Sequence, residues 1–232
     1  DFKIIINGTD EFPIEFKFNA MCVNDAPQFV QPMRPSQYLN MPFEPWFYDN
    51  YLYKIALNGN LEMPPKEEYL KKIHSNKVEC MKLFKEKYDT DTNFKNYCQK
   101  VDKEAIKQFI KLTEIDCDKL SDYLLKSQRG KIYMCYKNNK FYYETLDKKL
   151  YKIVHMEKKE NTNYIYKTET GMNLEIKLRF KNGCGLQLPA FQIKRKIPTV
   201  GELKKICDNN NIKSPTLKKD ICNILNQHNI IY

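Results

Sequence analysis

The amino-acid sequence predicts a mixed α/β protein of the α+β class, and three observations support this prediction. Residues 1–19 alternate apolar and polar side chains with the period of two that is typical of β-strands. Residues 64–128 contain no glycine and show helical periodicity, with many lysines. Residues 130–196 return to strand-like alternation between turn residues. Helix-rich and strand-rich stretches are therefore segregated along the chain.

Changes in composition divide the chain into four predicted units. These are a core hairpin and helix in residues 1–60, a helical subdomain in 61–129, an antiparallel β-rich part of the core in 130–196, and a small helical tail in 197–232.

The first unit opens with two predicted strands joined by Asn7–Gly8, a pair that tolerates positive φ and so favours a hairpin turn. On the second strand, Glu15, Lys17 and Asn19 share one face. The other face is apolar and suited to a core, with Ile14, Phe16 and Phe18.

A proline-rich connector is predicted for residues 20–45, because five prolines exclude a long helix. Gln28 and Arg34 on this connector are candidates to contact a phosphate or an active site, although a plain connector is at least as good an interpretation. A buried helix is predicted for residues 45–58, with Pro45 in its first turn and Trp46, Tyr53 and Leu57 on one side.

The helical subdomain is predicted to contain one long helix in residues 66–88, followed by shorter helices. These cover the region around residues 92–101 and then 103–112 and 116–126. Its lysines fit a solvated surface, and some of them also fit contacts with a nucleic-acid backbone.

The β-rich part is predicted to be an antiparallel meander whose first hairpin turns at Asn138–Asn139. Its last strand, 186–193, contains Pro189 and is placed at an edge or bulge. Lys177, Arg179 and Lys181 are expected on the same face as Glu175, where they form a basic stripe.

Charge and cysteine content limit the classes of partner. The 232-residue chain carries a formal charge of +10 with a pI near 9.0, which favours an anionic partner such as nucleic acid or an anionic membrane surface. A solvated lysine-rich surface explains the same charge equally well. The eight cysteines are scattered without a CxxC pair, which is typical of reduced thiols in an intracellular protein of the cytoplasm or nucleus.

Neither a membrane span nor a signal peptide is expected. No run of residues approaches the ~18 apolar residues of a membrane span, so no membrane partner is predicted. Because the chain begins at Asp1, inside a predicted strand and without an initiator Met, we expect residues to precede it.

The opening hairpin contains the elements of a metal site. Hydrolysis of a phosphodiester uses a divalent cation held by carboxylates, and an adjacent lysine can orient the attacking water or offset phosphate charge. Asp1, Glu15 and Lys17 supply these groups, with the backbone carbonyl of Phe16 as a further oxygen ligand. An amphipathic hairpin that binds no metal fits the same pattern.

The arrangement D-x13-E-F-K, with an apolar residue before the Glu, resembles the PD-(D/E)xK nuclease superfamily. The resemblance covers roughly the first thirty residues and implies a restriction-endonuclease-like mixed sheet core. By this resemblance Asp1 and Glu15 are ligands of Mg²⁺ or Mn²⁺, Lys17 is the catalytic lysine, and Gln28 matches loosely a glutamine of some branches. A homodimer is a possible assembly, because such enzymes often pair two active sites.

A second E-x-K triplet competes with this site. Glu175 and Lys177 lie on a predicted strand, with Glu169 across the Thr170–Gly171 turn. Since amphipathic strands generate this triplet readily, the first site is preferred on its spacing, and the second is interpreted as a strand that faces a nucleic-acid backbone.

The tail adds an independent observation. The matches L-K-x-I-C, N-I and T-L-K-K-x-x-I-x-x-L in residues 203–225 resemble a SAP motif, a two-helix DNA-binding module. The resemblance implies phosphate contacts from the tail lysines, Lys204, Lys205, Lys213, Lys218 and Lys219. A helical hairpin packed on the body of the protein is an equal alternative.

The sequence as a whole therefore favours a magnesium-dependent deoxyribonuclease, an endonuclease of restriction, resolvase or repair type that acts on double-stranded DNA. The alternatives are a non-catalytic DNA-binding protein and an RNA-directed nuclease.

Overall fold

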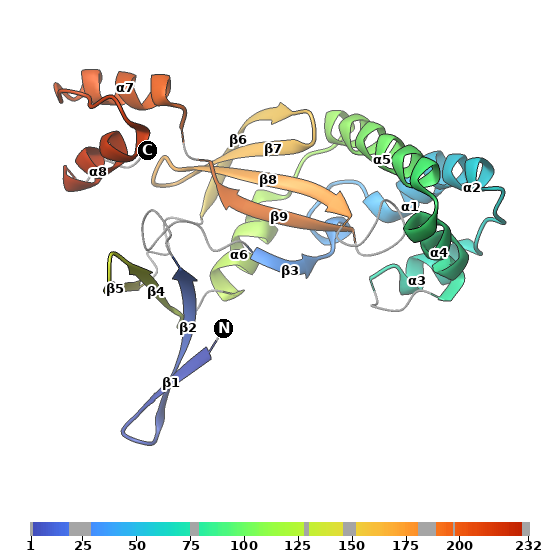
Figure 1. Cartoon of the computed structure of the whole chain (residues 1–232), viewed down its shortest axis with the longest axis horizontal. Helices are drawn as coiled ribbons and strands as arrows, with labels where there is room; N and C mark the ends of the chain where they lie inside the picture. The colour runs from blue at the N-terminus through green and yellow to red at the C-terminus, as the bar shows by residue number, and fades with distance from the viewer. Residues whose placement is uncertain are drawn as a thin grey trace.

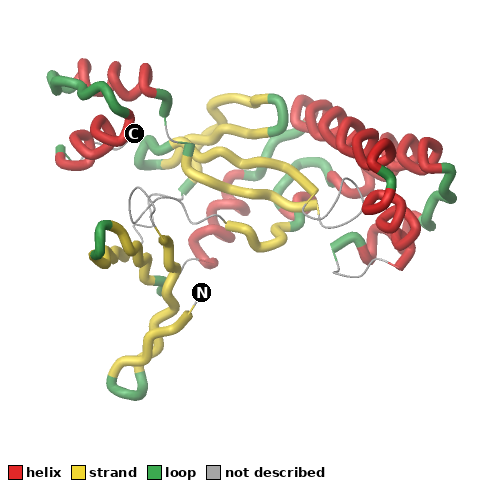
Figure 2. Tube along the Cα trace, in the orientation of Figure 1, coloured by secondary structure: helices red, strands yellow, loops and turns green. Residues whose placement is uncertain are grey.

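The structure is a computed structural model that describes residues 2–18, 29–74, 79–127, 130–145, 152–180, 189–196 and 198–228. These residues form two β-sheets, a group of helices and a C-terminal helical hairpin, so the protein belongs to the α+β class, as predicted. Figure 1 shows most of the helices gathered at one end of the larger sheet, the helix Cys117–Ser127 below it, and the hairpin near its opposite end. Figure 2 gives the same arrangement by type of secondary structure.

The first sheet has four strands and is mixed. Its order is β1 (Phe2–Ile6), β2 (Asp10–Phe18), β4 (Ile132–Lys137) and β5 (Lys140–Thr145). The β1–β2 and β4–β5 pairs are antiparallel hairpins, whereas β2 and β4 are parallel. Parallel strands require a long crossover, and here most of the helices lie between the two strands in sequence.

The second sheet has five antiparallel strands. Its order is β3 (Phe29–Met33), β9 (Pro189–Arg195), β8 (Asn173–Phe180), β7 (Asn163–Thr168) and β6 (Ile153–Glu160). Strands β6 to β9 form the predicted meander, which is confirmed. The β4–β5 hairpin was expected to continue this meander but belongs to the other sheet.

The helical region begins with α1 (Phe43–Phe47), continues through a π-helical turn (Tyr48–Leu52) and enters α2 (Tyr53–Gly59). It continues with α3 (Lys66–Lys72), α4 (Lys82–Thr90), α5 (Thr92–Leu112) and α6 (Cys117–Ser127). The tail consists of α7 (Val200–Asn209) and α8 (Lys218–Gln227).

The main core lies between helices α1 to α6 and one face of the five-stranded sheet. Strand β8 buries every second residue, namely Leu174, Ile176, Leu178 and Phe180. The ring of Phe180 lies 5.6 Å from that of Phe43 and 4.8 Å from that of Phe47, which connects β8 to α1. Aromatic pairs at such separations add about 0.5–1.5 kcal/mol each to the burial of apolar area.

Two buried tyrosines of β7 hold the connection between α5 and α6. The Tyr164 hydroxyl lies 2.7 Å from Thr113 Oγ1, which in turn donates to the carbonyl oxygen of Phe109. The amide of Ile115 donates to the Tyr166 hydroxyl oxygen at 3.0 Å. Burial raises the pKa of both tyrosines, because the phenolate form would be desolvated.

The region predicted as one buried helix over 45–58 differs in its start and its buried side. The helix begins at Phe43, and Pro45 is tolerated within its first turn, where a missing amide breaks no helical bond. The π-helical turn rotates the residues after it away from the 3.6-residue phase. Tyr53 and Leu57 are therefore 48% and 81% exposed, contrary to the prediction.

Two other predictions along the chain are corrected. The expected long helix over 66–88 is interrupted, since α3 ends at Lys72 and α4 begins at Lys82. The two helices expected over 92–112 are one continuous helix, α5, with Asp91 as its N-cap. The proline-rich connector contains β3, in which Pro32 is accommodated because the strand lies at an irregular sheet edge.

Replacement of Tyr166 by Phe tests the tyrosine contact between the sheet and the helices. The change leaves the buried amide of Ile115 without its acceptor, so we expect the free energy of unfolding to fall by about 1–3 kcal/mol in urea denaturation. Tyr53→Phe removes an exposed hydroxyl and is the matched control, with a change within about 0.5 kcal/mol. Equal stability of the two variants would contradict this role of Tyr166.

Candidate nucleic-acid interface

The outer face of the five-stranded sheet carries the predicted basic stripe. Because β8 buries its even-numbered residues, its odd-numbered residues face outwards. Lys177 and Arg179 are exposed there, and Glu175 is half-buried, which confirms the predicted face for these three residues. Lys181, the third predicted cation, lies outside the described residues.

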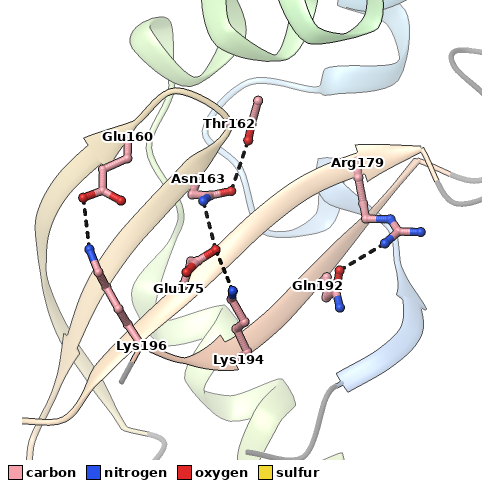
Figure 3. Close-up of polar contacts among 8 residues, drawn as sticks. All are labelled: Glu160, Thr162, Asn163, Glu175, Arg179, Gln192, Lys194 and Lys196. Atoms are coloured by element: carbon pink, nitrogen blue, oxygen red, sulfur yellow. Dashed lines mark hydrogen bonds and ion pairs between the residues drawn. The ribbon is translucent and has the colours of Figure 1, made fainter. Parts of the chain in front are cut away.

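Strand β9 extends this face. Glu175 lies opposite Lys194 and Lys177 lies opposite Gln192, and residues opposite each other in an antiparallel pair share a face. Figure 3 shows the contacts: Arg179 Nη1 donates to Gln192 Oε1 at 3.2 Å, and Lys194 Nζ lies 3.2 Å from Glu175 Oε1. The basic sheet face is defined as Lys177, Arg179, Gln192, Lys194 and Lys196.

Glu175 and Glu160 neutralise part of this charge. Glu175 accepts a hydrogen bond from Asn163 Nδ2 at 2.9 Å and pairs with Lys194, while Glu160 pairs with Lys196 at 3.0 Å (Figure 3). Lys177 and Arg179 form no ion pair with a carboxylate among the described residues. These two cations are therefore available to an external anion.

The tail meets this face at a cleft of about 480 Å³. The sheet contributes Lys167, Asn173 and Lys196 to its lining, and α7 contributes Glu202 and Lys205. Hydrogen bonds from His155 and Lys167 lower the pKa of Glu157, a further lining residue, because they stabilise its carboxylate. The cleft thus connects the cations of β9 with those of α7.

The tail has a hydrophobic cluster of its own. Leu203, Cys207, Ile221, Cys222 and Leu225 are buried against one another and form a cluster separate from the main core. The sequence Thr199-Val-Gly-Glu202 predicts a capping box, and this prediction is confirmed, because Thr199 is the N-cap of α7 and its side chain and that of Glu202 form the box. The tail is therefore built as a helical pair around its own core.

The second tail helix begins later than expected. Ser214–Pro215 in the sequence predicts the start of the second helix, with Leu217 pointing inward, but α8 starts at Lys218 and Leu217 is 65% exposed. Lys219 is exposed in the first turn of α8, and Lys218 is half-buried there. In α7, Lys205 is exposed and Lys204 half-buried, and Lys213 is exposed between the helices. A cation at a helix N-terminus opposes the macrodipole, and a bound anion offsets this repulsion.

The opening hairpin places Glu15 next to a lysine that sequence reasoning missed. Glu15 is only 13% exposed, and its Oε2 lies 3.4 Å from Lys131 Nζ, just before β4. Lys17 belongs to β2, opposite Cys135 of β4. Asp1, the other predicted metal ligand, lies outside the described residues. Because Lys131 is 116 residues away in sequence, only the parallel β2–β4 pairing brings it here.

The other predicted site residues are separate from Glu15. Arg34 is exposed between β3 and a 3₁₀ turn, at the edge of the five-stranded sheet, and Gln28 lies outside the described residues. Glu169 of the competing triplet pairs with Lys152 at 3.7 Å, so Glu169 and Glu175 engage different lysines. Across the described ranges, no three His, Cys, Asp or Glu side chains are grouped to hold a metal ion.

Two general properties bear on the surroundings of the protein. No helix in the described part of the chain is long and apolar enough to cross a membrane. The six cysteines in the described part of the chain are free thiols. Four of them are buried, namely Cys98, Cys135, Cys207 and Cys222.

Comparison with known proteins adds no relative. No protein-family model matches the chain, and no curated protein or solved structure matches it. The resemblances to the PD-(D/E)xK superfamily and to the SAP motif therefore stay predictions.

Replacement of Ile221 by Ala tests whether the tail is an independently stabilised unit. The cavity left by a buried Ile lowers stability by about 2–5 kcal/mol, and we expect this loss to open only the tail. Thiol labelling followed by peptide mass spectrometry should then show faster reaction of Cys207 and Cys222. Cys98 of the main core is the internal control, and an equal acceleration at Cys98 would contradict a separate unit.

Proposed function

We propose that the protein binds the phosphate backbone of double-stranded DNA through the basic sheet face and the tail lysines. The observation that carries the proposal is the position of Lys177 and Arg179, which are exposed on the face opposite the core and unpaired with carboxylates in the described chain. The formal charge of +10 supports an anionic partner. The resemblance of the tail to a duplex-binding module favours DNA over RNA.

The geometry supports one continuous contact. The cations run from Arg179 and Lys177 across β9 to Lys196, and the cleft joins Lys196 to Lys205 of α7. Contacts of this kind fix the position of the protein on the backbone and carry little sequence information. Each neutralised phosphate releases counterions, so affinity falls steeply with salt concentration.

The double variant Lys177→Ala/Arg179→Ala tests this interface. We expect weaker binding to every duplex sequence, with the slope of log K against log salt reduced by about 2, or about 0.9 for each lost phosphate contact. Fluorescence anisotropy over a range of salt concentrations measures both quantities.

The matched control is Lys103→Ala/Lys107→Ala on α5, which removes the same charge from exposed positions. If this control weakens binding as much as the sheet variant, only net charge matters and the interface is wrongly placed. An RNA duplex measured in parallel decides the choice of nucleic acid.

A second proposal concerns hydrolysis, and the half-buried contact of Glu15 with Lys131 favours it. Mg²⁺ is commonly held by one or two carboxylates together with waters and substrate phosphate. Glu15 would supply one carboxylate, and the Phe16 carbonyl would supply a further oxygen. Asp1 would complete the predicted ligands. A bound Mg²⁺ would supply an activated water. The Lys131 and Lys17 amines would offset negative charge on the phosphate.

Glu15→Gln tests this proposal against Glu11→Gln, an exposed acid on the same strand and on the same face. We expect Glu15→Gln to reduce Mg²⁺-dependent cleavage of duplex DNA by roughly 100-fold or more, because a ligand charge is lost. Binding in EDTA should stay unchanged in both variants. Unimpaired cleavage by Glu15→Gln would remove this residue from the reaction.

We also propose an intracellular location in a reducing compartment, which the free thiols favour.

A further inference from the structure

The four-stranded sheet presents aromatic side chains in adjacent rows on one face. Phe16 of β2 lies opposite Met134 of β4, which lies opposite Tyr143 of β5. In the next row, Tyr136 lies opposite Phe141. Because these positions share strand parity, their side chains lie on the same side of the sheet, the side opposite Glu15.

Three aromatic side chains on this face are exposed. Tyr143 is 72% exposed, Phe141 is 60% exposed and Phe16 is 37% exposed. The ring of half-buried Tyr136 lies 4.8 Å from that of Phe141, its partner across the β4–β5 pair. Single exposed apolar residues are common on protein surfaces, but a contiguous patch marks an interaction site.

The chemistry of the patch points to nucleobases as its occupant. Planar aromatic rings on an open sheet stack on unpaired bases, and every base offers a π-face, so such binding is tolerant of sequence. Positive charge on the protein would attract the phosphates that connect the stacked bases. The chain as a whole has a formal charge of +10, which favours a phosphate-containing partner.

We propose that Phe16, Phe141 and Tyr143 form a stacking surface for unpaired bases of a single nucleic-acid strand. The proposal rests on the DNA binding proposed above and deepens it. It assigns the binding of single-stranded nucleic acid to the four-stranded sheet, in addition to the duplex binding of the five-stranded sheet. The basic sheet face and the tail bind duplex phosphates, while the aromatic face binds bases that are not paired. The preferred substrate is then a duplex that carries a single-stranded end or gap.

The test compares Phe141→Ala/Tyr143→Ala with the parent protein on three probes. These are an oligo-deoxythymidine strand, a blunt duplex, and the same duplex with a single-stranded overhang. We expect the variant to bind the single strand about 10- to 100-fold more weakly, about tenfold for each lost stacking contact, and to bind the blunt duplex within about twofold of the parent. The overhang should strengthen binding of the parent and not of the variant.

A spectroscopic readout and a matched control make the test specific. A 2-aminopurine base in the single strand should lose fluorescence on binding the parent, through stacking, and not on binding the variant. The single variant Tyr143→Phe keeps the ring, so we expect it to retain the single-strand affinity and the fluorescence loss of the parent. Tyr53→Ala/Leu57→Ala removes two exposed apolar side chains from α2 and should change neither.

The outcomes separate this proposal from the proposed function. Failure of the parent to bind any of the probes would overturn both proposals. Normal duplex binding together with unchanged single-strand affinity in Phe141→Ala/Tyr143→Ala would overturn the stacking surface alone. A parent dimer that becomes monomeric in this variant, with unchanged single-strand affinity, would assign the face to contact between two copies and overturn the proposal as well.

Discussion

The packing of α1 and α5 against one face of the five-stranded sheet is the interaction on which the remainder of the structure depends. Phe180 of β8 and Phe109 of α5 both contact the ring of Phe43, so sheet and helices share one aromatic core. Because side chains alternate along a strand, burial of Leu174 to Phe180 on one face forces Lys177 and Arg179 onto the other. The basic sheet face is therefore a consequence of the way in which the core is packed.

The same constraint separates the functions that we propose. The five-stranded sheet has one face in the core, and its open face is polar and cationic. The four-stranded sheet instead exposes rings of Phe16, Phe141 and Tyr143 on one face and holds Glu15 beside Lys131 on the other. The tail has its own hydrophobic cluster, so its lysines are presented by a unit that need not share the stability of the main core.

The parts of the fold that depend on local physics were predictable from the sequence. Asn138 and Asn139 both adopt positive φ in the predicted hairpin turn, and Thr199 caps α7 as its capping box indicates. The alternation of β8 is visible in the sequence alone. The face of Lys177 and Arg179 follows from that alternation, so this part of the candidate site needed no tertiary information.

The remaining features required contacts between distant residues. Lys131 reaches Glu15 only through the parallel pairing of β2 with β4, which no local pattern specifies. Strand β3 forms on a proline-containing segment because β9 offers an edge. Leu57 is exposed because a π-helical turn shifts the phase of the helix, and hydrophobic periodicity assumes that no such turn occurs.

Lysine footprinting of the full chain, with and without duplex DNA, tests the central claim most directly. An amine-reactive reagent followed by mass spectrometry measures the reactivity of each lysine. The account predicts strong protection of Lys177, Lys205 and Lys219 by DNA, together with unchanged reactivity of Lys103 and Lys107 on α5. Uniform protection of all five lysines, or protection confined to α5, would contradict it.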